Sequence, residues 1–150
     1  LDHFAEVRTH NDAQTAVISA PEREAHRITN EYRVMMGRRA VMIDDRLVNA
    51  ARGHSSEMHE KGYFSHTSPT PGRASPSDRA RLAGWGGGVS ENIAQGQPTP
   101  EAVIRGWCHS SGHHRNILGT GHTHLGVGKA PAANVWTQNF GKGSSNPRSK

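Results

Sequence analysis

The sequence is poor in cysteine and in aromatic residues, and both shortages limit how the chain can fold. Its 150 residues include one cysteine, Cys108, so no disulfide can form within the chain. A single cysteine is compatible with both oxidising and reducing compartments, because oxidising compartments permit disulfides without requiring them. Aromatic residues make up 5% of the chain and hydrophobic residues 33%, which predicts a small core. Next to Trp107 in an apolar segment, Cys108 is interpreted as a small buried hydrophobic residue rather than a nucleophile.

Long hydrophobic runs and a concentrated basic patch are also missing. No stretch approaches the ~20 apolar residues of a membrane-spanning helix, so we expect no transmembrane segment, and no signal peptide is present in this chain. The net charge is +5, yet most of the arginines are dispersed between Arg23 and Arg115, and only residues 142–150 are locally basic. We therefore do not expect nucleic acid as a partner. The length suits a single monomeric domain.

Capping residues and helical spacing predict most of the secondary structure. We expect residues 1–20 to be a loosely ordered lead-in or linker, residues 21–141 to be the domain, and residues 142–150 to be a disordered basic tail. Residues 125–128 and 135–140 alternate as two strands of an antiparallel hairpin, in which Trp136 points inward like Trp107. The expected helices run from Pro21 to near Gly37 with Ser19 as cap, from Asp44 to Gly62, from Pro76 to about Ala83, and onward from Thr99.

Histidine is abundant where cysteine is scarce: the chain has 11, and most lie between His54 and His124. Such clustering is typical of metal binding or of acid–base chemistry. His54 and His59 flank Glu57, but they are five residues apart and so do not share a helix face. We interpret His54 as a core residue and His59 as solvated.

Two further histidine groups lie near the end of the domain. His109 and His113 are four residues apart, but Gly112 disfavours a helix through them, so the pair need not share a face. His122 and His124 flank a turn and are interpreted as exposed loop residues.

Several short motifs follow one another in an order that resembles the CAP superfamily, also called the SCP domain, in its cysteine-poor bacterial branch. This superfamily comprises cysteine-rich secretory proteins, antigen 5 and plant pathogenesis-related proteins. The resemblance covers about residues 22–141 and implies an α+β fold, a three-layer α-β-α sandwich around a small, mostly antiparallel sheet. The motifs are Gly62-Tyr63-Phe64-Ser65-His66, Ser75-Pro76-Ser77-Asp78-Arg79, Ser90-Glu91-Asn92-Ile93-Ala94, Ser111-Gly112-His113-His114-Arg115-Asn116, Leu125-Gly126-Val127-Gly128 and Trp136-Thr137-Gln138-Asn139-Phe140.

The same resemblance implies a central cleft with two histidines and acidic partners. His66 and His113 match the two cleft histidines, and Glu91 matches the glutamate of the Gly-Glu-Asn motif, whose glycine is Ser90 here. Larger members carry a second cleft glutamate where this chain has Ser110, and Ser111 replaces the usual proline. The cleft set is therefore His66, Glu91, Ser110 and His113, and it lacks the second carboxylate.

Two imidazoles near a carboxylate suit zinc or another divalent cation, with His66 and His113 as the metal ligands. Two histidines predict modest affinity and open coordination positions. A competing interpretation is a structural triad, in which Glu91 hydrogen-bonds one of the two histidines and stabilises the fold.

The expected function is that of a secreted or envelope-associated CAP-domain protein that acts by binding an unidentified lipid, glycan or protein. One alternative is a metal-assisted hydrolase with Glu91 as general base. No nucleophile-elbow pattern surrounds Ser68, Ser110 or Ser111, so a serine nucleophile is not expected. Another alternative is an interaction module of a larger protein.

Overall fold

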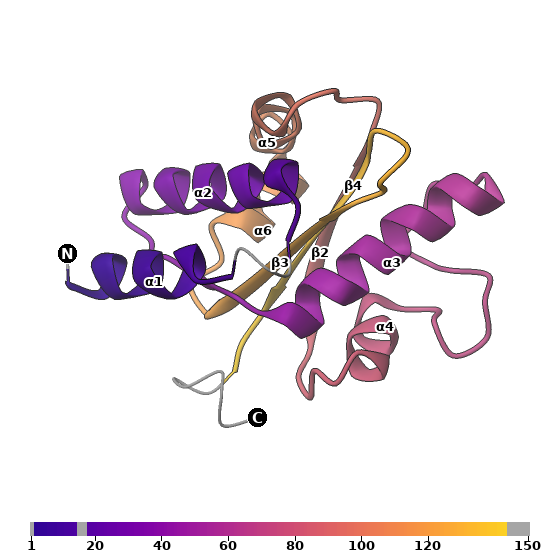
Figure 1. Cartoon of the computed structure of the whole chain (residues 1–150), viewed down its shortest axis with the longest axis horizontal. Helices are drawn as coiled ribbons and strands as arrows, with labels where there is room; N and C mark the ends of the chain where they lie inside the picture. Colours follow the sequence, from indigo (N-terminus) through magenta and orange to yellow (C-terminus); the bar gives the residue numbers. More distant parts are fainter. Residues whose placement is uncertain (1, 15–17, 144–150) are drawn as a thin grey trace.

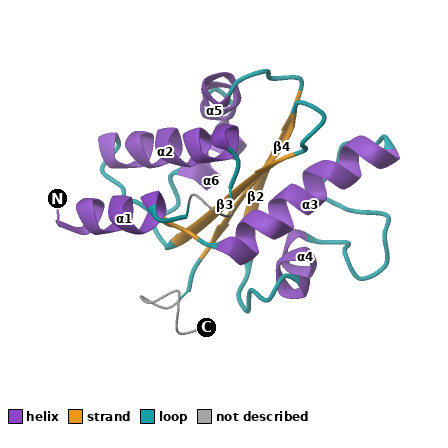
Figure 2. Cartoon of the chain, viewed as in Figure 1, coloured by secondary structure: helices purple, strands orange, loops and turns teal. Residues whose placement is uncertain are grey.

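The computed structural model describes residues 2–14 and 18–143, which form six helices and four strands (Figures 1 and 2). The helices are α1 (Asp2–Asp12), α2 (Ala20–Met35), α3 (Asp45–Lys61), α4 (Pro76–Leu82), α5 (Pro100–Cys108) and α6 (Ser111–Ile117). The strands are β1 (Met42–Ile43), β2 (Val89–Gln95), β3 (His124–Lys129) and β4 (Val135–Gly141).

The four strands form one mixed sheet in the order β1-β3-β4-β2. β1 pairs with β3 in parallel, whereas β3 with β4 and β4 with β2 are antiparallel. β2 is therefore an edge strand, although it lies before β3 in the sequence. The predicted hairpin is confirmed as β3–β4, and the predicted α-β-α sandwich with a mostly antiparallel sheet is confirmed by helices on both faces.

The predicted helix starts are confirmed by their capping contacts. Ser19 and Glu22 form a reciprocal capping box at the start of α2, and Ser75 and Asp78 form another at the start of α4. The Thr99 hydroxyl accepts a hydrogen bond at the start of α5. α3 ends at Gly62, whose φ of 69° is a conformation that glycine adopts without strain. These local signals fix where the chain turns toward and away from the sheet.

Glycines in β3 let α3 lie directly on the sheet. A Cβ atom at Gly126 would lie 2.2 Å from the carbonyl carbon of Leu47, and one at Gly128 would lie 2.0 Å from the amide nitrogen of Arg52. The hydroxyl of Ser55 in α3 also donates to the carbonyl of Gly128. The face of β3 that carries these two glycines is therefore the contact surface for α3.

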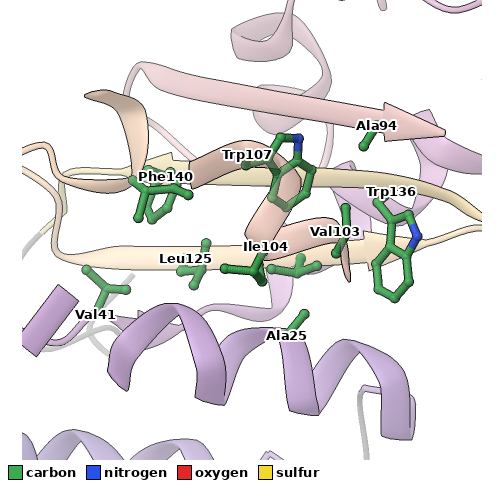
Figure 3. Close-up of a cluster of buried hydrophobic side chains, with 11 residues drawn as sticks. Ala25, Val41, Ala94, Val103, Ile104, Trp107, Leu125, Trp136 and Phe140 are labelled. Carbon is green, nitrogen blue, oxygen red and sulfur yellow. The ribbon is translucent and has the colours of Figure 1, made fainter. Parts of the chain in front are cut away.

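The opposite face of the sheet carries the main hydrophobic core against α2, α5 and α6 (Figure 3). Ala25 of α2 points toward Val103 and Ile104 of α5 in this view. Trp107 is 2% exposed and Trp136 is fully buried, which confirms both as core residues. Their indole nitrogens donate to the backbone carbonyls of Ile93 and Gln97, at 3.0 and 2.9 Å respectively. The N–H group of each buried ring therefore has a hydrogen-bond partner.

The first residues differ from their prediction as a loose lead-in. Residues 2–12 form α1, which buries Val7 and hydrogen-bonds to the β1 region through His10 and Asn11. These contacts are made to residues more than 25 positions away, so no helical spacing of apolar residues within the segment predicts them. The domain boundary at residue 21 stays a prediction. Of the predicted basic tail, residues 144–150 lie outside the described part of the chain.

Two predictions about individual side chains also need correction. His124 is 1% exposed in β3, and His122 is half-buried, with its ring stacked 4.6 Å from Phe140, so neither is an exposed loop residue. Cys108 is only partly buried, at the rim of the main core. His54 is fully buried and His59 is exposed, as predicted.

His26 links α2 to β3 as a neutral imidazole. Its Nδ1 lies 2.7 Å from the carbonyl oxygen of Glu22, and its Nε2 accepts from the amide of Val127 at 3.0 Å. Because Nε2 already accepts a hydrogen bond, it cannot carry the second proton that would make the ring cationic. Burial accordingly lowers the pKa of His26 from 6.5 to about 4.

We expect acid to destabilise the fold through His26. The folded pKa lies below the unfolded value, so the unfolded chain binds the extra proton, and stability that is complete above pH 6.5 is lost as the pH falls toward 4. This contribution amounts to about 3 kcal/mol. Urea unfolding of wild type and His26→Gln at several pH values measures it, and an equally steep acid loss in the variant would contradict the assignment.

Candidate functional site

Glu91 occupies the edge strand β2 and faces the layer formed by α3 and α4. It pairs with Asn139 of β4, two positions from Thr137, whose hydroxyl hydrogen-bonds to Ser55 of α3 at 2.8 Å. Residues alternate across a strand, so Asn92 faces the opposite layer. Glu91 is nevertheless buried, with a side chain only 1% exposed.

Arg79 of α4 pairs with Glu91 inside the fold. Its Nη2 donates to Oε1 and Oε2 of Glu91 at 3.1 and 2.9 Å. Its Nη1 donates to the carbonyl oxygens of Arg73 and Ala74 at 2.9 and 3.0 Å. The Arg79 side chain is fully buried. It therefore compensates the buried carboxylate and holds the loop that precedes α4.

His66 approaches the same carboxylate from the loop between α3 and α4. Its Nδ1 lies 2.8 Å from Oε1 of Glu91, and its side chain is 50% exposed. Because the carboxylate accepts, the neutral imidazole carries its proton on Nδ1. Nε2 is then left with a lone pair, which is the form in which histidine binds a metal.

The loop that carries His66 is anchored to α3 by Glu57. The carboxylate of Glu57 accepts from Tyr63, Ser68 and Thr70, and it pairs with Arg73 at 3.3 Å. Burial alone raises the pKa of Glu57, but the hydrogen bonds and the guanidinium lower it to about 2. The loop is thus held on both sides of His66 by a charged carboxylate.

His113 reaches the edge of β2 from the other layer, on α6. Asn92 of β2 donates to the carbonyl oxygen of His113 at 3.2 Å, and Asn116 of α6 donates to the carbonyl oxygen of Glu91 at 3.1 Å. Burial lowers the pKa of His113, and the charge of nearby His66 lowers it further. The two imidazoles are therefore close enough to interact electrostatically.

A shallow groove of about 300 Å³ extends from His113 over the end of β2. Ser110, which precedes α6, lines it together with Trp107 and with Phe64, whose ring is 45% exposed. The groove floor also contains Ile93 and Ala94 of β2. It offers a largely apolar surface beside His113.

The structure brings most of the predicted set together. Glu91 contacts His66 directly, His113 is their electrostatic neighbour, and Ser110 lies in the same groove as His113. Within residues 2–14 and 18–143, no group of three or more His, Cys, Asp or Glu side chains is placed to hold a metal ion. A metal would therefore depend on the two imidazoles and on ligands from outside the chain.

Sequence reasoning did not assign a role to Arg79, although it noted the Ser75–Arg79 motif. A signal was available in that motif: the capping box fixes the start of α4, and Arg79 lies one turn into this short helix. Because β2 was not predicted, the sequence did not show that Glu91 is buried and therefore requires a cationic partner. The anchoring residues Asn92, Asn116 and Gln138 were missed for the same reason.

Comparison with known proteins identifies one family and two similar bacterial proteins. Residues 26–140 match the model of the CAP family, described as the cysteine-rich secretory protein family. The uncharacterized protein YkwD of Bacillus subtilis is 42% identical over 124 residues, which cover 82% of this chain and 48% of that protein. The uncharacterized membrane protein YlbC of the same organism is 36% identical over 126 residues, which cover 79% of this chain and 34% of that protein. The chain thus spans about half or less of these curated relatives.

Solved structures show the same fold. An extracellular protein containing an SCP domain from Bacillus anthracis superposes with a TM-score of 0.77 at 32% identity, covering 82% of this chain and 40% of that one. An outer surface protein from Borrelia burgdorferi superposes with a TM-score of 0.69 at 20% identity, covering 79% of this chain and 90% of that one. The second likeness concerns the fold alone.

Proposed function

Since this chain belongs to the CAP family, we propose that it is an extracellular or envelope-associated binding domain whose cleft holds a divalent metal ion through His66 and His113. Two neighbouring imidazoles at one sheet edge are the ligands, and Glu91 and Arg79 are positioning residues. The unidentified partner, a lipid, glycan or protein, lies in the adjoining groove.

The observation that carries this proposal is the hydrogen bond between His66 Nδ1 and Glu91 Oε1 at 2.8 Å. A carboxylate that accepts from Nδ1 fixes the ring orientation of a metal-binding histidine and leaves Nε2 as the ligand atom. Arg79 holds the carboxylate from the other side, so Glu91 cannot rotate away without breaking a buried ion pair. Burying the charges of Glu91 and Arg79 costs free energy. A binding role for His66 explains why the two side chains converge beside it.

The donor set fits zinc or a similar ion held with modest affinity. Two imidazole nitrogens fall short of the three protein ligands of a typical catalytic zinc site. Both side chains are accessible enough for exchange, with His66 half-exposed and His113 partly buried. A divalent ion bound there would supply a Lewis-acidic centre for an oxygen or nitrogen of the partner.

The groove next to the histidines supports binding rather than hydrolysis by Glu91. Both carboxylate oxygens of Glu91 already accept hydrogen bonds, from Arg79 and His66, inside the fold. A general base needs an oxygen within reach of the proton that it removes. The apolar floor around Phe64 and Trp107 instead provides contact surface for a partner.

An extracellular or envelope location is supported by the related Bacillus anthracis protein, which is described as extracellular. Among the described helices, none combines the length and apolar character needed to cross a membrane. Fractionation of the native cells with an antibody against the domain tests the location, and a signal confined to the cytoplasm would contradict it.

Zinc is expected to raise the thermal stability of the domain at pH 7 and to lose this effect in acid, because the imidazoles must be neutral to bind. At ten times the dissociation constant the gain is about 1.4 kcal/mol, or roughly 3–5 °C in Tm. His66→Ala and His113→Ala should each remove the response. Differential scanning calorimetry with and without zinc measures it.

The matched controls are His59→Ala and His109→Ala, because both histidines are exposed and lie outside the cleft. Both control variants should keep the full zinc response. A zinc response that survived in His66→Ala but vanished in a control variant would place the metal elsewhere.

A further inference from the structure

A second pocket, of about 490 Å³, lies at the start of α3 and shares no residue with the groove at His113. Three segments line it: Arg46 of α3, the glycine-rich turn 84–87 that follows α4, and residues 142–143 after β4. No carboxylate is among these lining residues, whereas two of them are cationic. The family resemblance assigns nothing to this pocket.

Trp85 supplies a buried donor without an acceptor. Its side chain is 4% exposed, and its indole Nε1 makes no hydrogen bond within the described residues. Nε1 lies 3.3 Å from the position that a Cβ atom would take at Gly87, a residue that lines the pocket. The indole nitrogen can only donate, and leaving a buried donor unpaired is costly. Trp107 and Trp136, by contrast, both donate to carbonyl groups.

The turn beside Trp85 adds backbone donors. Within the described part of the chain, the amides of Gly86, Gly87 and Gly88 have no backbone or side-chain acceptor. A Cβ atom at Gly87 would lie 3.2 Å from the carbonyl oxygen of Lys142, so a side chain would crowd the approach of the two segments. Gly86 and Gly87 line the pocket, so their unpaired amides can donate to a ligand there.

Two cations complete the pocket. The guanidinium of Arg46 lies 5.0 Å from the centroid of the Trp85 ring and is oriented by Asp44, which accepts from its Nε and Nη2. Lys142 is exposed, and its ammonium forms no ion pair with any described residue. The pocket therefore combines donors and positive charge with no competing acceptor from a lining side chain.

We propose that this pocket binds an oxyanion of the phosphate class. The Trp85 indole N–H and the amides of Gly86 and Gly87 donate to its oxygens, and Lys142 supplies the compensating charge. Arg46, already paired with Asp44, borders the pocket. The phosphate is either a free anion or part of a lipid headgroup, since both present the same tetrahedral group to these donors.

The three tryptophans provide the readout. In a ¹⁵N-labelled protein the three indole N–H groups give separate NMR signals, and titration with inorganic phosphate should shift the Trp85 signal in a saturable way. The Trp107 and Trp136 signals should not move, because both donors are already bound to carbonyls inside the core. A Trp85 signal that stays unchanged at saturating phosphate would overturn the proposal.

Lys142→Gln should weaken phosphate binding roughly tenfold, which corresponds to the loss of one charge-assisted hydrogen bond. Lys129→Gln is the matched control, because Lys129 also lies near a tryptophan but outside this pocket. Trp85→Phe keeps most of the ring and removes the donor, so phosphate binding, followed by calorimetry, should weaken while the fold is retained. Equal affinity in Lys142→Gln and wild type would contradict the assignment.

Vesicles distinguish the two sources of phosphate. Sedimentation with phosphatidylcholine vesicles that contain phosphatidylglycerol, but not with phosphatidylcholine alone, would identify a lipid headgroup, provided that Lys142→Gln abolishes it. Saturable binding of inorganic phosphate without vesicle retention would identify the free anion. Failure of both arms would remove the site without affecting the zinc proposal, because the two sites share no residue.

Discussion

Arg79→Leu is expected to lower the free energy of unfolding by about 3–5 kcal/mol, because it strands the buried carboxylate of Glu91. Among the described residues the Glu91 carboxylate would keep His66 alone as a partner, and the carbonyl groups of Arg73 and Ala74 would lose their donor. The loop with His66 should loosen at the same time. Urea unfolding followed by circular dichroism measures the loss.

Arg81→Leu provides the matched control in the same short helix. Arg81 is 69% exposed and pairs with Asp78 at the surface, so its removal should change stability by less than about 0.5 kcal/mol. The double variant Arg79→Leu/Glu91→Leu should recover part of the loss, because no charge is then left buried. If Arg79→Leu cost no more than Arg81→Leu, the buried pair would not stabilise this face.

Trp136→Ala is expected to cost about 3–5 kcal/mol, enough to unfold a domain of marginal stability. The ring is fully buried in the main core against α5, and the variant would also leave the carbonyl of Gln97 without its donor. Trp107→Ala should behave alike, since that ring is 2% exposed. Thermal unfolding of both variants measures the effect.

Leu82→Ala serves as the control for the tryptophan variants, because Leu82 is 65% exposed and its loss should matter little. A Trp136→Ala variant that melted like Leu82→Ala would show that the hairpin does not carry the core.

The parts of the fold that could be predicted are those with local chemical signals. A hydroxyl residue with a proline one or two positions later predicts each of three helix starts, at Ser19, Ser75 and Thr99. The alternation of side chains around Trp136 predicts β4. At each of these helix starts the pattern and the capping contact involve residues close in the sequence.

Elements that depend on distant contacts could not be predicted. α1 lacks a marked apolar stripe and is tied to the β1 region by His10 and Asn11. β2 presents Glu91 and Asn92, polar residues that become buried only because Arg79, Asn116 and Gln138 converge on them from three other elements. α6 forms despite Gly112, since Ile117 packs into the main core. Tertiary contacts outweigh local preference in all three.

The site residues stay a prediction, and their arrangement around β2 could not be predicted from the sequence. The resemblance to the CAP family predicted one cleft for His66, Glu91 and His113. In the structure His66 hydrogen-bonds to Glu91 of the edge strand β2, and the backbone of His113 is tied to the neighbouring Asn92 of the same strand. The histidine count was a poorer guide. His26, His54 and His124 are buried within the fold, and burial lowers the pKa of each of them.

The most direct test of the metal site is a calorimetric titration of zinc into wild type, into His66→Ala/His113→Ala and into the control His59→Ala/His109→Ala at pH 7. We predict that wild type and control bind one zinc ion per chain with the same affinity, and that the cleft double variant shows no such binding. Zinc binding of equal stoichiometry and affinity in the cleft double variant would contradict the account and leave His66 and Glu91 as a purely structural pair.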